Sequence, residues 1–228
     1  APTDWTAISV GGAFGRTCGI RDNGTLMCWG PNGNNGNGNL STSPIEPDTY
    51  PVYVSTPPGL SATQVSIGYA HSCATMNNGS AMCWGTGEPE DCCDGRLGDG
   101  LMTTSFTPVF VNLPVGRTVE SISAGMSHTC AVMDNGSVMC WGWGVSGQLG
   151  DGGLEFGDFD QPTVYVGLPS GRTATSVLAG ANHSCSLLDN GSVMCWGSNQ
   201  FGEIGDDTTS QQSAPGDPQY VALPIGRT

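Results

Sequence analysis

The sequence contains no lysine, and only 11% of its 228 residues are charged. Six arginines stand against twenty carboxylates, so the formal net charge is −14. Binding to the phosphates of nucleic acid or to an anionic membrane surface requires clustered basic side chains. We therefore expect neither nucleic acid nor an anionic membrane as a partner.

Long apolar runs and helical periodicity are also missing. No apolar run approaches the ~20 residues of a membrane helix, and no segment has apolar residues at the i, i+3, i+4 spacing of an amphipathic helix. We expect no membrane insertion and essentially no helix. The first residues, Ala1–Trp5, lack an initiator Met and do not form a signal peptide, which is typical of a mature product or an excised segment.

What the sequence does contain is one motif that occurs four times. Each copy has two cysteines ten positions apart, Asn-Gly midway and Trp-Gly after the second cysteine, and the first cysteines are 55, 57 and 55 residues apart. This period is that of a large supersecondary unit. The copies are Cys18–Gly30, Cys73–Gly85, Cys130–Gly142 and Cys185–Gly197. We interpret the chain as a single array with repeats at approximately 1–57, 58–112, 113–167 and 168–222, and with 223–228 starting a further linker motif.

The repeated motif predicts a β-hairpin closed by a disulfide. If residues 134–136 form a three-residue loop with Gly136 in the left-handed region, Cys130 and Cys140 lie directly opposite each other. Opposed side chains have Cβ atoms ~4.5–5.5 Å apart, which is close to disulfide reach. Zinc ligands prefer gaps of about two to four residues, so we favour disulfides over metal and expect an oxidising compartment. The predicted pairs are Cys18–Cys28, Cys73–Cys83, Cys130–Cys140 and Cys185–Cys195.

Three further segments recur around each hairpin. A short alternating run such as Val65–Gly68 precedes it, a glycine-rich turn such as Arg96–Gly100 follows it, and a proline-led segment such as Pro108–Val111 comes last. Alternation predicts half-buried strands, and proline at the first position of a strand costs no ladder hydrogen bond. The sequence therefore predicts an all-β protein, a β-propeller-type array of four four-stranded antiparallel blades that is either a partial or a small propeller.

The pattern Ala-Gly-x-x-His-Ser/Thr-Cys-x3-Asp-Asn-Gly-Ser-Val-x-Cys-Trp-Gly, followed by Gly-Gln-Leu-Gly-Asp-Gly, resembles the regulator of chromosome condensation repeat. The resemblance covers the whole chain and is strongest in the third and fourth repeats. It implies four-stranded antiparallel blades, usually seven in a closed ring. Because four repeats are too few for that ring, three arrangements are open: part of a longer chain, blades assembled between molecules, or a four-bladed closure.

The resemblance also implies a range of functions. The founding activity of the family is nucleotide exchange on a small nuclear GTPase, and other members are photoreceptors, enzyme inhibitors and secreted bacterial proteins. The paired cysteines of this chain depart from the nuclear members and resemble the secreted ones. Function is carried by sites rather than by the fold, so the family alone does not select one of these activities.

Two aromatic residue types recur at fixed positions. Histidine occupies one position in three repeats (His71, His128 and His183), and Arg16 replaces it in the first. A ring of imidazoles near a propeller axis could bind metal, but we expect a structural hydrogen bond to the neighbouring strand or blade. We expect the repeated tryptophans to pack between blades, against the next one, with indole N–H groups bonded to backbone. They are Trp29, Trp84, Trp141 and Trp196; for the unrepeated Trp5 and Trp143 the alternative to packing is stacking on carbohydrate.

Two acidic or cysteine-containing features stand outside the repeat. Cys92 and Cys93 form a disulfide with each other, bond another chain, or join nearby carboxylates in a metal site; the first is the simplest because the other eight cysteines are paired. The acidic segments Glu88–Asp94, Asp151–Asp160 and Asp206-Asp207 offer the oxygen ligands that calcium prefers. None has the Asp-x-Asp-x-Asp-Gly spacing, so we expect a solvated acidic rim and no cofactor.

Six asparagines lie in N-glycosylation acceptor motifs: Asn23, Asn39, Asn78, Asn135, Asn182 and Asn190. Four of them are the hairpin asparagine, which the turn itself requires. If the chain is secreted by a eukaryote, glycans at exposed hairpin tips are an expected modification.

No nucleophile, acid and base occur together outside the repeated positions, so we predict that the protein is not an enzyme. The leading hypothesis is a secreted, extracellular structural or binding module, including a subunit of an assembly or fibre that associates with neighbouring subunits. The alternative is an inhibitor or adhesin that binds protein through the variable blade loops. A guanine-nucleotide exchange factor is less favoured, because hairpin disulfides would not persist in a reducing nucleus.

Overall fold

The structure is a computed structural model that describes residues 5–10, 15–30, 48–86, 95–152, 165–209 and 218–222. These residues contain only strands, turns and irregular backbone. In this described part of the chain no helix is long and apolar enough to cross a membrane. The expectation of an all-β fold is confirmed.

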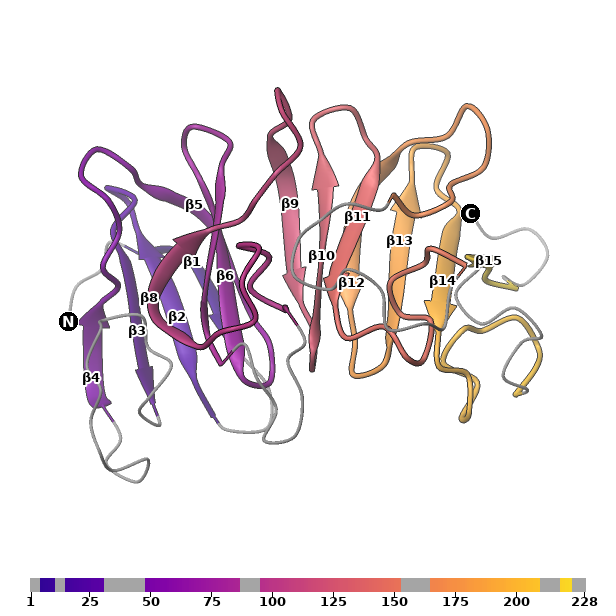
Figure 1. Cartoon of the computed structure of the whole chain (residues 1–228), viewed down its shortest axis with the longest axis horizontal. Coiled ribbons are helices and arrows are strands. Elements are labelled where there is room, and N and C mark those ends of the chain that lie inside the picture. The colour runs from indigo at the N-terminus through magenta and orange to yellow at the C-terminus, as the bar shows by residue number, and fades with distance from the viewer. Residues whose placement is uncertain are drawn as a thin grey trace.

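The strands form four antiparallel sheets that lie side by side in chain order (Figure 1). Within each sheet the strands follow one another in sequence order, as in a meander. The first sheet is β1 (Trp5–Val10), β2 (Thr17–Arg21), β3 (Leu26–Gly30) and β4 (Asp48–Tyr53), and the second is β5 (Ala62–Ile67), β6 (His71–Met76), β7 (Ala81–Gly85) and β8 (Ser105–Phe110). The third is β9 (Val119–Ala124), β10 (His128–Met133) and β11 (Val138–Gly142), with Tyr165 bridging to Met139, and the fourth is β12 (Ala174–Ala179), β13 (His183–Leu188), β14 (Val193–Gly197) and β15 (Gln219–Tyr220).

The central hairpin of each sheet has the predicted register. In the third sheet Cys130 pairs with Cys140, and the Met133 N–H donates to the Ser137 carbonyl, which leaves a three-residue loop. Gly136 closes this loop with φ of 74°, a left-handed conformation that suits glycine. The register puts the paired Cα atoms 4.0–4.1 Å apart, and all four predicted hairpin disulfides are present.

The proline-led segments extend further than predicted. The outer strands β4 and β8 begin three residues before Pro51 and Pro108, so each proline lies inside its strand rather than at its first position. These strands are at the sheet edge, where one row of N–H groups has no strand to bond. Proline is tolerated there because its missing N–H breaks no ladder hydrogen bond.

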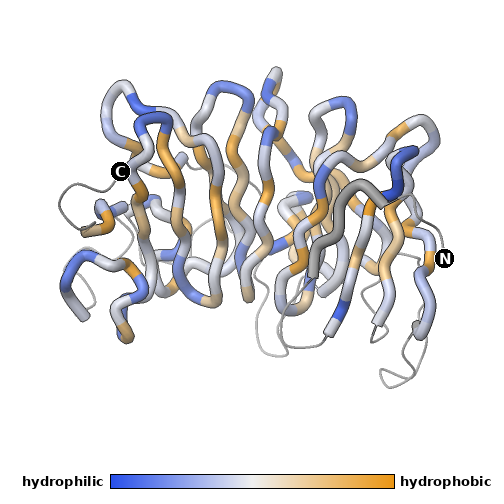
Figure 2. Tube along the Cα trace, turned by 180° about the vertical axis from the view of Figure 1, so that it is seen from behind, coloured by the Kyte–Doolittle hydropathy of each residue, from blue (hydrophilic) through white to orange (hydrophobic). Residues whose placement is uncertain are grey.

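The hydrophobic core lies between the sheets. One cluster joins the first and second sheets, a second joins the second and third, and a third joins the third and fourth. The third cluster contains the Cys130–Cys140 disulfide together with Ala174, Val177 and Trp196 of the fourth sheet. Hydrophobic residues run along the strands, and hydrophilic residues gather at the turns (Figure 2). Each sheet therefore depends on its neighbours for burial.

Candidate functional site

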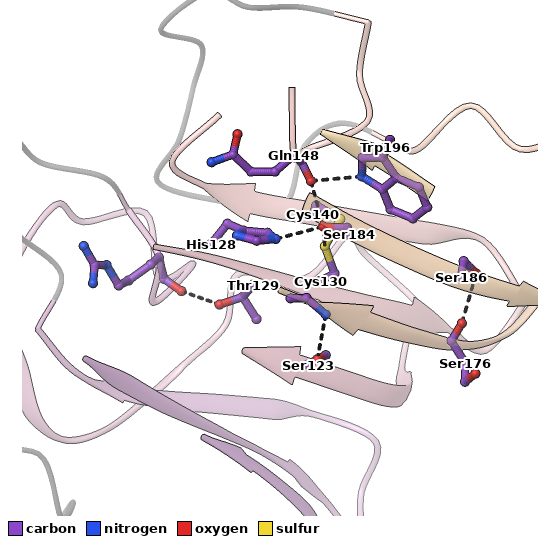
Figure 3. The surroundings of a disulfide bond; sticks show 12 residues. Ser123, His128, Thr129, Cys130, Cys140, Gln148, Ser176, Ser184, Ser186 and Trp196 are labelled. Carbon is purple, nitrogen blue, oxygen red and sulfur yellow. Dashed lines mark hydrogen bonds between the residues drawn. A yellow bond between two sulfur atoms is a disulfide. The ribbon is translucent and has the colours of Figure 1, made fainter. Parts of the chain in front are cut away.

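The third and fourth sheets are joined by a chain of buried hydrogen bonds (Figure 3). The His128 Nε2–H donates to the Ser184 hydroxyl at 2.8 Å, and that hydroxyl donates to the Gln148 carbonyl at 2.9 Å. The indole N–H of Trp196 donates to the same carbonyl at 2.9 Å. We call this set of histidine, hydroxyl, turn carbonyl and indole the clasp. The histidine and the turn belong to one repeat, and the hydroxyl and the indole belong to the next.

The same clasp joins the second and third sheets. The His71 Nε2–H donates to the Thr129 hydroxyl at 2.8 Å, and the hydroxyl donates to the Arg96 carbonyl at 2.9 Å. The Trp141 indole N–H donates to that carbonyl at 3.1 Å. Arg96 stands in the turn after β7, at the position that Gln148 occupies after β11. The motif residues therefore form the contact at both of these interfaces.

The clasp determines the protonation state of its histidines. The Thr129 and Ser184 hydroxyls each donate their one hydrogen bond to a backbone carbonyl. Each hydroxyl can therefore only accept a hydrogen bond from the imidazole. The histidines therefore carry a proton on Nε2, and their buried Nδ1 atoms have no partner among the described residues. Burial, followed by the charge of Arg96, lowers the pKa of His71 well below its usual value. Burial, followed by His183 and Arg96, lowers the pKa of His128 to about 3.

Glycines make room for the clasp at two places. A Cβ on Gly125 would lie 2.7 Å from the His128 Cε1 atom and 2.5 Å from the Gly180 carbonyl oxygen. A Cβ on Gly150 would lie 2.8 Å from the indole nitrogen of Trp196. These distances are shorter than van der Waals contact, so the histidine and the indole each pack against a bare glycine Cα.

The sequence predicted the wrong neighbour for the repeated tryptophans. Trp141 and Trp196 are buried between sheets with their N–H groups on backbone carbonyls, as expected. Those carbonyls belong to the preceding repeat, so Trp-Gly packs against the preceding sheet and not the next one. The reason is that the turns with Arg96 and Gln148, after the second and third hairpins, fold over the following sheet. Trp84 is buried without a described N–H partner, and Trp29, in the first sheet, is only partly buried.

The first interface uses a different residue. The buried Arg16 guanidinium donates to the carbonyl oxygens of Gly68 and Tyr69 at 3.3 and 3.2 Å. Burial lowers its pKa to about 10. Arg16 stands at the position of the repeated histidine and, like it, bonds the next sheet. Ser72, at the position of Thr129, keeps its hydroxyl buried without a partner in the described part of the chain.

A groove runs across the C-terminal ends of β5, β9 and β12, the first strands of three sheets. It has a volume of about 320 Å³, and its lining includes Gly68, Gly125 and Gly180 together with Tyr69 and Met126. The Tyr69 N–H donates to the Gly125 carbonyl, and the Met126 N–H donates to the Gly180 carbonyl. Two of the backbone carbonyls in the groove thus serve the contact between sheets. Nothing in its lining combines a nucleophile with an acid or a base.

The remaining predicted residues are scattered over the surface. Asn23, Asn78, Asn135 and Asn190 lie exposed at the hairpin tips, each accepting a backbone N–H from two residues ahead, and Asn182 is exposed in the turn before β13. Asp206 accepts from Asn199 and from Thr208. Trp143 is partly buried. Cys92, Cys93, Asn39, the side chain of Trp5, residues 88–94 and 153–160 lie outside the described residues. Within those that are described, no three His, Cys, Asp or Glu side chains gather to hold a metal ion.

Sequence reasoning missed the hydroxyl and the carbonyl of the clasp. The signal was present, because Ser or Thr follows every repeated histidine, but the spacing of 56 to 58 residues between partners hides their contact. It also missed polar side chains of first strands that bond the next sheet. Ser66 accepts from the Ala124 N–H at 3.0 Å, and Ser123 accepts from the Ala179 N–H at 2.9 Å.

Comparison with known proteins agrees with this geometry. The chain is 29% identical to the ultraviolet-B receptor UVR8 of Arabidopsis thaliana over 192 residues, which are 84% of this chain and 41% of the receptor. It is 32% identical over 143 residues to the human E3 ubiquitin-protein ligase HERC2, covering 62% of this chain and 3% of the ligase. The chain thus spans less than half the length of these relatives.

Solved structures show the same fold. The structure of yeast RCC1 (Prp20) bound to Kap60 matches with a TM-score of 0.80 and 23% identity, over 97% of this chain and 50% of that one. Human WBSCR16 matches with a TM-score of 0.77 and 21% identity, over 95% and 54%. Models of the regulator of chromosome condensation (RCC1) repeat match residues 62–88, 119–148 and 174–203, and residues 78–132 and 135–187. The chain belongs to the RCC1 repeat family.

Proposed function

We propose that the protein is a secreted, non-catalytic protein-binding module of an extracellular assembly, stabilised by its hairpin disulfides and associating with neighbouring subunits. The observation that carries the proposal is the use of the recurring polar groups. In two successive interfaces the histidine donates to the hydroxyl, and both the hydroxyl and the indole donate to the turn carbonyl. The repeated residues thus hold the sheets together. Binding of another protein would therefore use the exposed surfaces of the array.

Disulfides support the extracellular part of the proposal. Four bridges at equivalent positions in four repeats are typical of proteins that fold in an oxidising compartment. The exposed hairpin asparagines, such as Asn78 and Asn135, are positioned where glycans would not disturb the core. An exchange-factor function has only the family resemblance in its favour.

The experiment is intact mass of the protein isolated from its natural source, under native conditions, before and after reduction and alkylation. We expect a shift of eight alkyl groups for the four hairpin bridges, visible only after reduction, and more if Cys92 and Cys93 are also bonded. The same spectrum reports glycans and bound subunits. A native chain with eight free hairpin thiols would contradict the extracellular assignment.

A second candidate, binding of a separate protein through the variable turns, is favoured by exposed apolar side chains there. Phe201 is 87% exposed in the turn after β14, and Leu101 is 58% exposed in the corresponding turn of the second repeat. Aromatic side chains such as Phe201 are enriched in protein interfaces, where a few large buried side chains act as anchors. The solved Prp20p of Saccharomyces cerevisiae is a protein with binding properties to Gsp1p and histones, so protein binding is a known use of this fold.

This candidate is tested by capture of partners on the immobilised protein, with a Phe201→Ser/Leu101→Ser variant in parallel. Loss of a stoichiometric partner with the double variant would support binding through the turns. The matched control is Val115→Ser, which changes a fully exposed apolar residue in the linker between the second and third sheets. Equal capture by both variants would contradict it.

A further inference from the structure

An aromatic residue recurs at the outer edge of all four sheets. In each sheet it stands directly opposite a methionine of the neighbouring strand. The aromatic residues are Tyr53, Phe110, Tyr165 and Tyr220, and the methionines opposite them are Met27, Met82, Met139 and Met194. We call the four aromatic side chains the aromatic row. The position belongs to the repeat in the same sense as the cysteines do, although it lies outside the hairpin.

The backbone positions the four rings in the same way. In every sheet the valine after the ring donates its N–H to the carbonyl of the residue before the methionine, at 2.9–3.0 Å. The donors are Val54, Val111, Val166 and Val221. This hydrogen bond makes the aromatic residue and the methionine a non-hydrogen-bonded pair, in which opposed side chains are closest. A methionine beside an aromatic ring is a favourable contact. The sheet, and not a flexible loop, therefore holds each ring.

The rings are open to solvent, although three of the four methionines opposite them are buried. The exposed fractions are 63% for Tyr53, 47% for Phe110, 45% for Tyr165 and 50% for Tyr220. The valine that follows each ring is buried in the first three sheets and belongs to the core between sheets. Single exposed apolar residues are normal on a protein surface. Four at one repeated position form a pattern that the packing of the core does not require.

The aromatic row follows the outer margin of the array. Adjacent sheets meet along their first strands, where the Ser66 and Ser123 hydroxyls accept backbone N–H groups of the next sheet. The last strands, such as β4 and β8, form the opposite edge of each sheet (Figure 1). Packed sheets lie about 10 Å apart, so rings on successive sheets are separated by about 10 Å or more. The rings are therefore separate platforms and not one contiguous apolar patch.

Charge and spacing together select the kind of ligand. No basic side chain lies in β4, β8 or β15, and the net charge of the chain is −14, so an anionic polymer would be repelled. A ligand that meets more than one ring must be extended and must present the same apolar face at intervals. A β-linked, uncharged polysaccharide does so, because the C–H groups of each sugar form a flat apolar face. Those hydrogens are attracted to the negative face of an aromatic ring.

We propose that the aromatic row binds an extended, uncharged, β-linked polysaccharide, with one sugar unit stacked on each aromatic side chain. This is a binding activity beyond the protein binding proposed above, and it uses none of the turn residues named there. Each stacking contact is weak. A polymer held by one ring meets the next ring at a high effective concentration, so several weak contacts add up to firm binding. Affinity therefore grows with the length of the polysaccharide chain.

The test is affinity electrophoresis of the 228-residue chain in native gels that contain a soluble polysaccharide. Hydroxyethyl cellulose and glucomannan, two uncharged β-1,4-linked polymers, are the probes, and polygalacturonate is the anionic control. We expect the uncharged polymers to retard the protein and polygalacturonate to have no effect. The retardation should not change with added salt, because no charge pair contributes to it. Cellobiose, which reaches only one ring, should compete weakly.

Matched variants separate the ring from its structural role. Phe110→Ile and Tyr165→Ile keep an apolar side chain that suits a strand but remove the flat ring. Each should weaken binding about two- to tenfold, and the double variant should weaken it further, with urea unfolding nearly unchanged. Tyr165→Phe keeps the ring and should bind like the wild type. The control is Val115→Ser, which changes an equally apolar, fully exposed residue outside the aromatic row and should not affect retardation.

Three results would overturn the proposal: no retardation by either uncharged polymer, retardation that the double isoleucine variant leaves unchanged, or retardation by polygalacturonate alone. Binding of poly-L-proline with no binding of either uncharged polysaccharide would also overturn it, because the rings would then fit a proline-rich protein segment. Failure of polysaccharide binding leaves the capture of a protein partner through the turns as a separate result. Reduced hairpin thiols in the natural source would instead contradict the extracellular function and leave the retardation unaffected.

Discussion

The third and fourth sheets present the same motif residues on corresponding faces, but among the described residues another sheet covers only the third. His128 is fully buried and bonded to Ser184, whereas His183 is partly exposed. Val132 is 2% exposed and Leu187 is 40% exposed. Because the local sequence is nearly the same, the difference comes from the neighbouring sheet. The motif thus encodes half of an interface, and its energetic value depends on what lies against it.

Three pairs of variants and one single variant test this difference between a covered and an uncovered face. The expected effects fall from the disulfides to the surface ion pairs.

Replacing both cysteines of one hairpin by alanine should give the largest loss. Ring closure over ten residues stabilises by about 3 kcal/mol in the chain-entropy account, and this applies equally to Cys130–Cys140 and Cys185–Cys195. The inner pair also packs under Val177 and Trp196 of the next sheet. Its removal should therefore cost about 1–2 kcal/mol more, from the cavity left behind, in urea unfolding. Equal losses would mean that the covering sheet adds nothing.

The next largest difference in stability is expected between Gly125→Ala and Gly180→Ala. A methyl group on Gly125 meets the Gly180 backbone carbonyl as well as the His128 ring, and the backbone cannot move aside. We expect a loss of about 1–3 kcal/mol from overpacking. The three atoms nearest to a methyl group on Gly180 all belong to the His183 side chain, which is partly exposed and can move more easily than backbone. A smaller loss is expected there, and thermal unfolding of both variants checks the order; a reversed order would contradict the role of the covering sheet.

The buried histidines should make the covered interfaces sensitive to acid. The folded-state pKa of His128 is about 3, below the value of about 6.5 for an unfolded chain. Between these values the unfolded state binds one more proton, so the stability present above pH 6.5 is lost as the pH falls, by up to about 1.4 kcal/mol per pH unit. His71 shifts in the same direction.

The substitution His128→Gln removes one of these two titrating side chains. The variant should be less stable at pH 7, because the clasp geometry changes, but its stability should fall less steeply between pH 6.5 and 4.5. Urea unfolding at several pH values measures the slope. An unchanged slope would show that His128 does not remain neutral in the folded protein.

Breaking the surface ion pairs should change the free energy of unfolding least, and by nearly equal amounts in the two repeats. Arg117–Asp134 and Arg172–Asp189, at 3.3 and 3.2 Å, join the linker to the hairpin loop in the third and fourth repeats. Both pairs are more than one third exposed on the arginine side. Asp134→Asn and Asp189→Asn should each cost less than about 1 kcal/mol, and less at high salt. A large difference between the two losses would show that the third and fourth sheets differ in more than the covering of one face.

Much of the fold followed from spacing within one repeat. Ten positions between Cys130 and Cys140 with Asn-Gly in the middle specify the hairpin, its loop and its register, because these contacts join residues close in sequence. The outer strands were less well predicted. Pro108 lies inside β8 because an edge strand tolerates a missing N–H, and only the position of that strand in the sheet decides this.

The sequence by itself determined the repeated unit: the hairpin, its disulfide, the glycine turns and the histidine and tryptophan positions. The tertiary structure decided which neighbour each residue contacts, including that Trp196 bonds the preceding repeat and that His128 bonds the following one. The physical reason is separation along the chain. A hydrogen bond between residues 56 positions apart leaves no local pattern, and burial of an identical motif depends on whether another sheet packs against it.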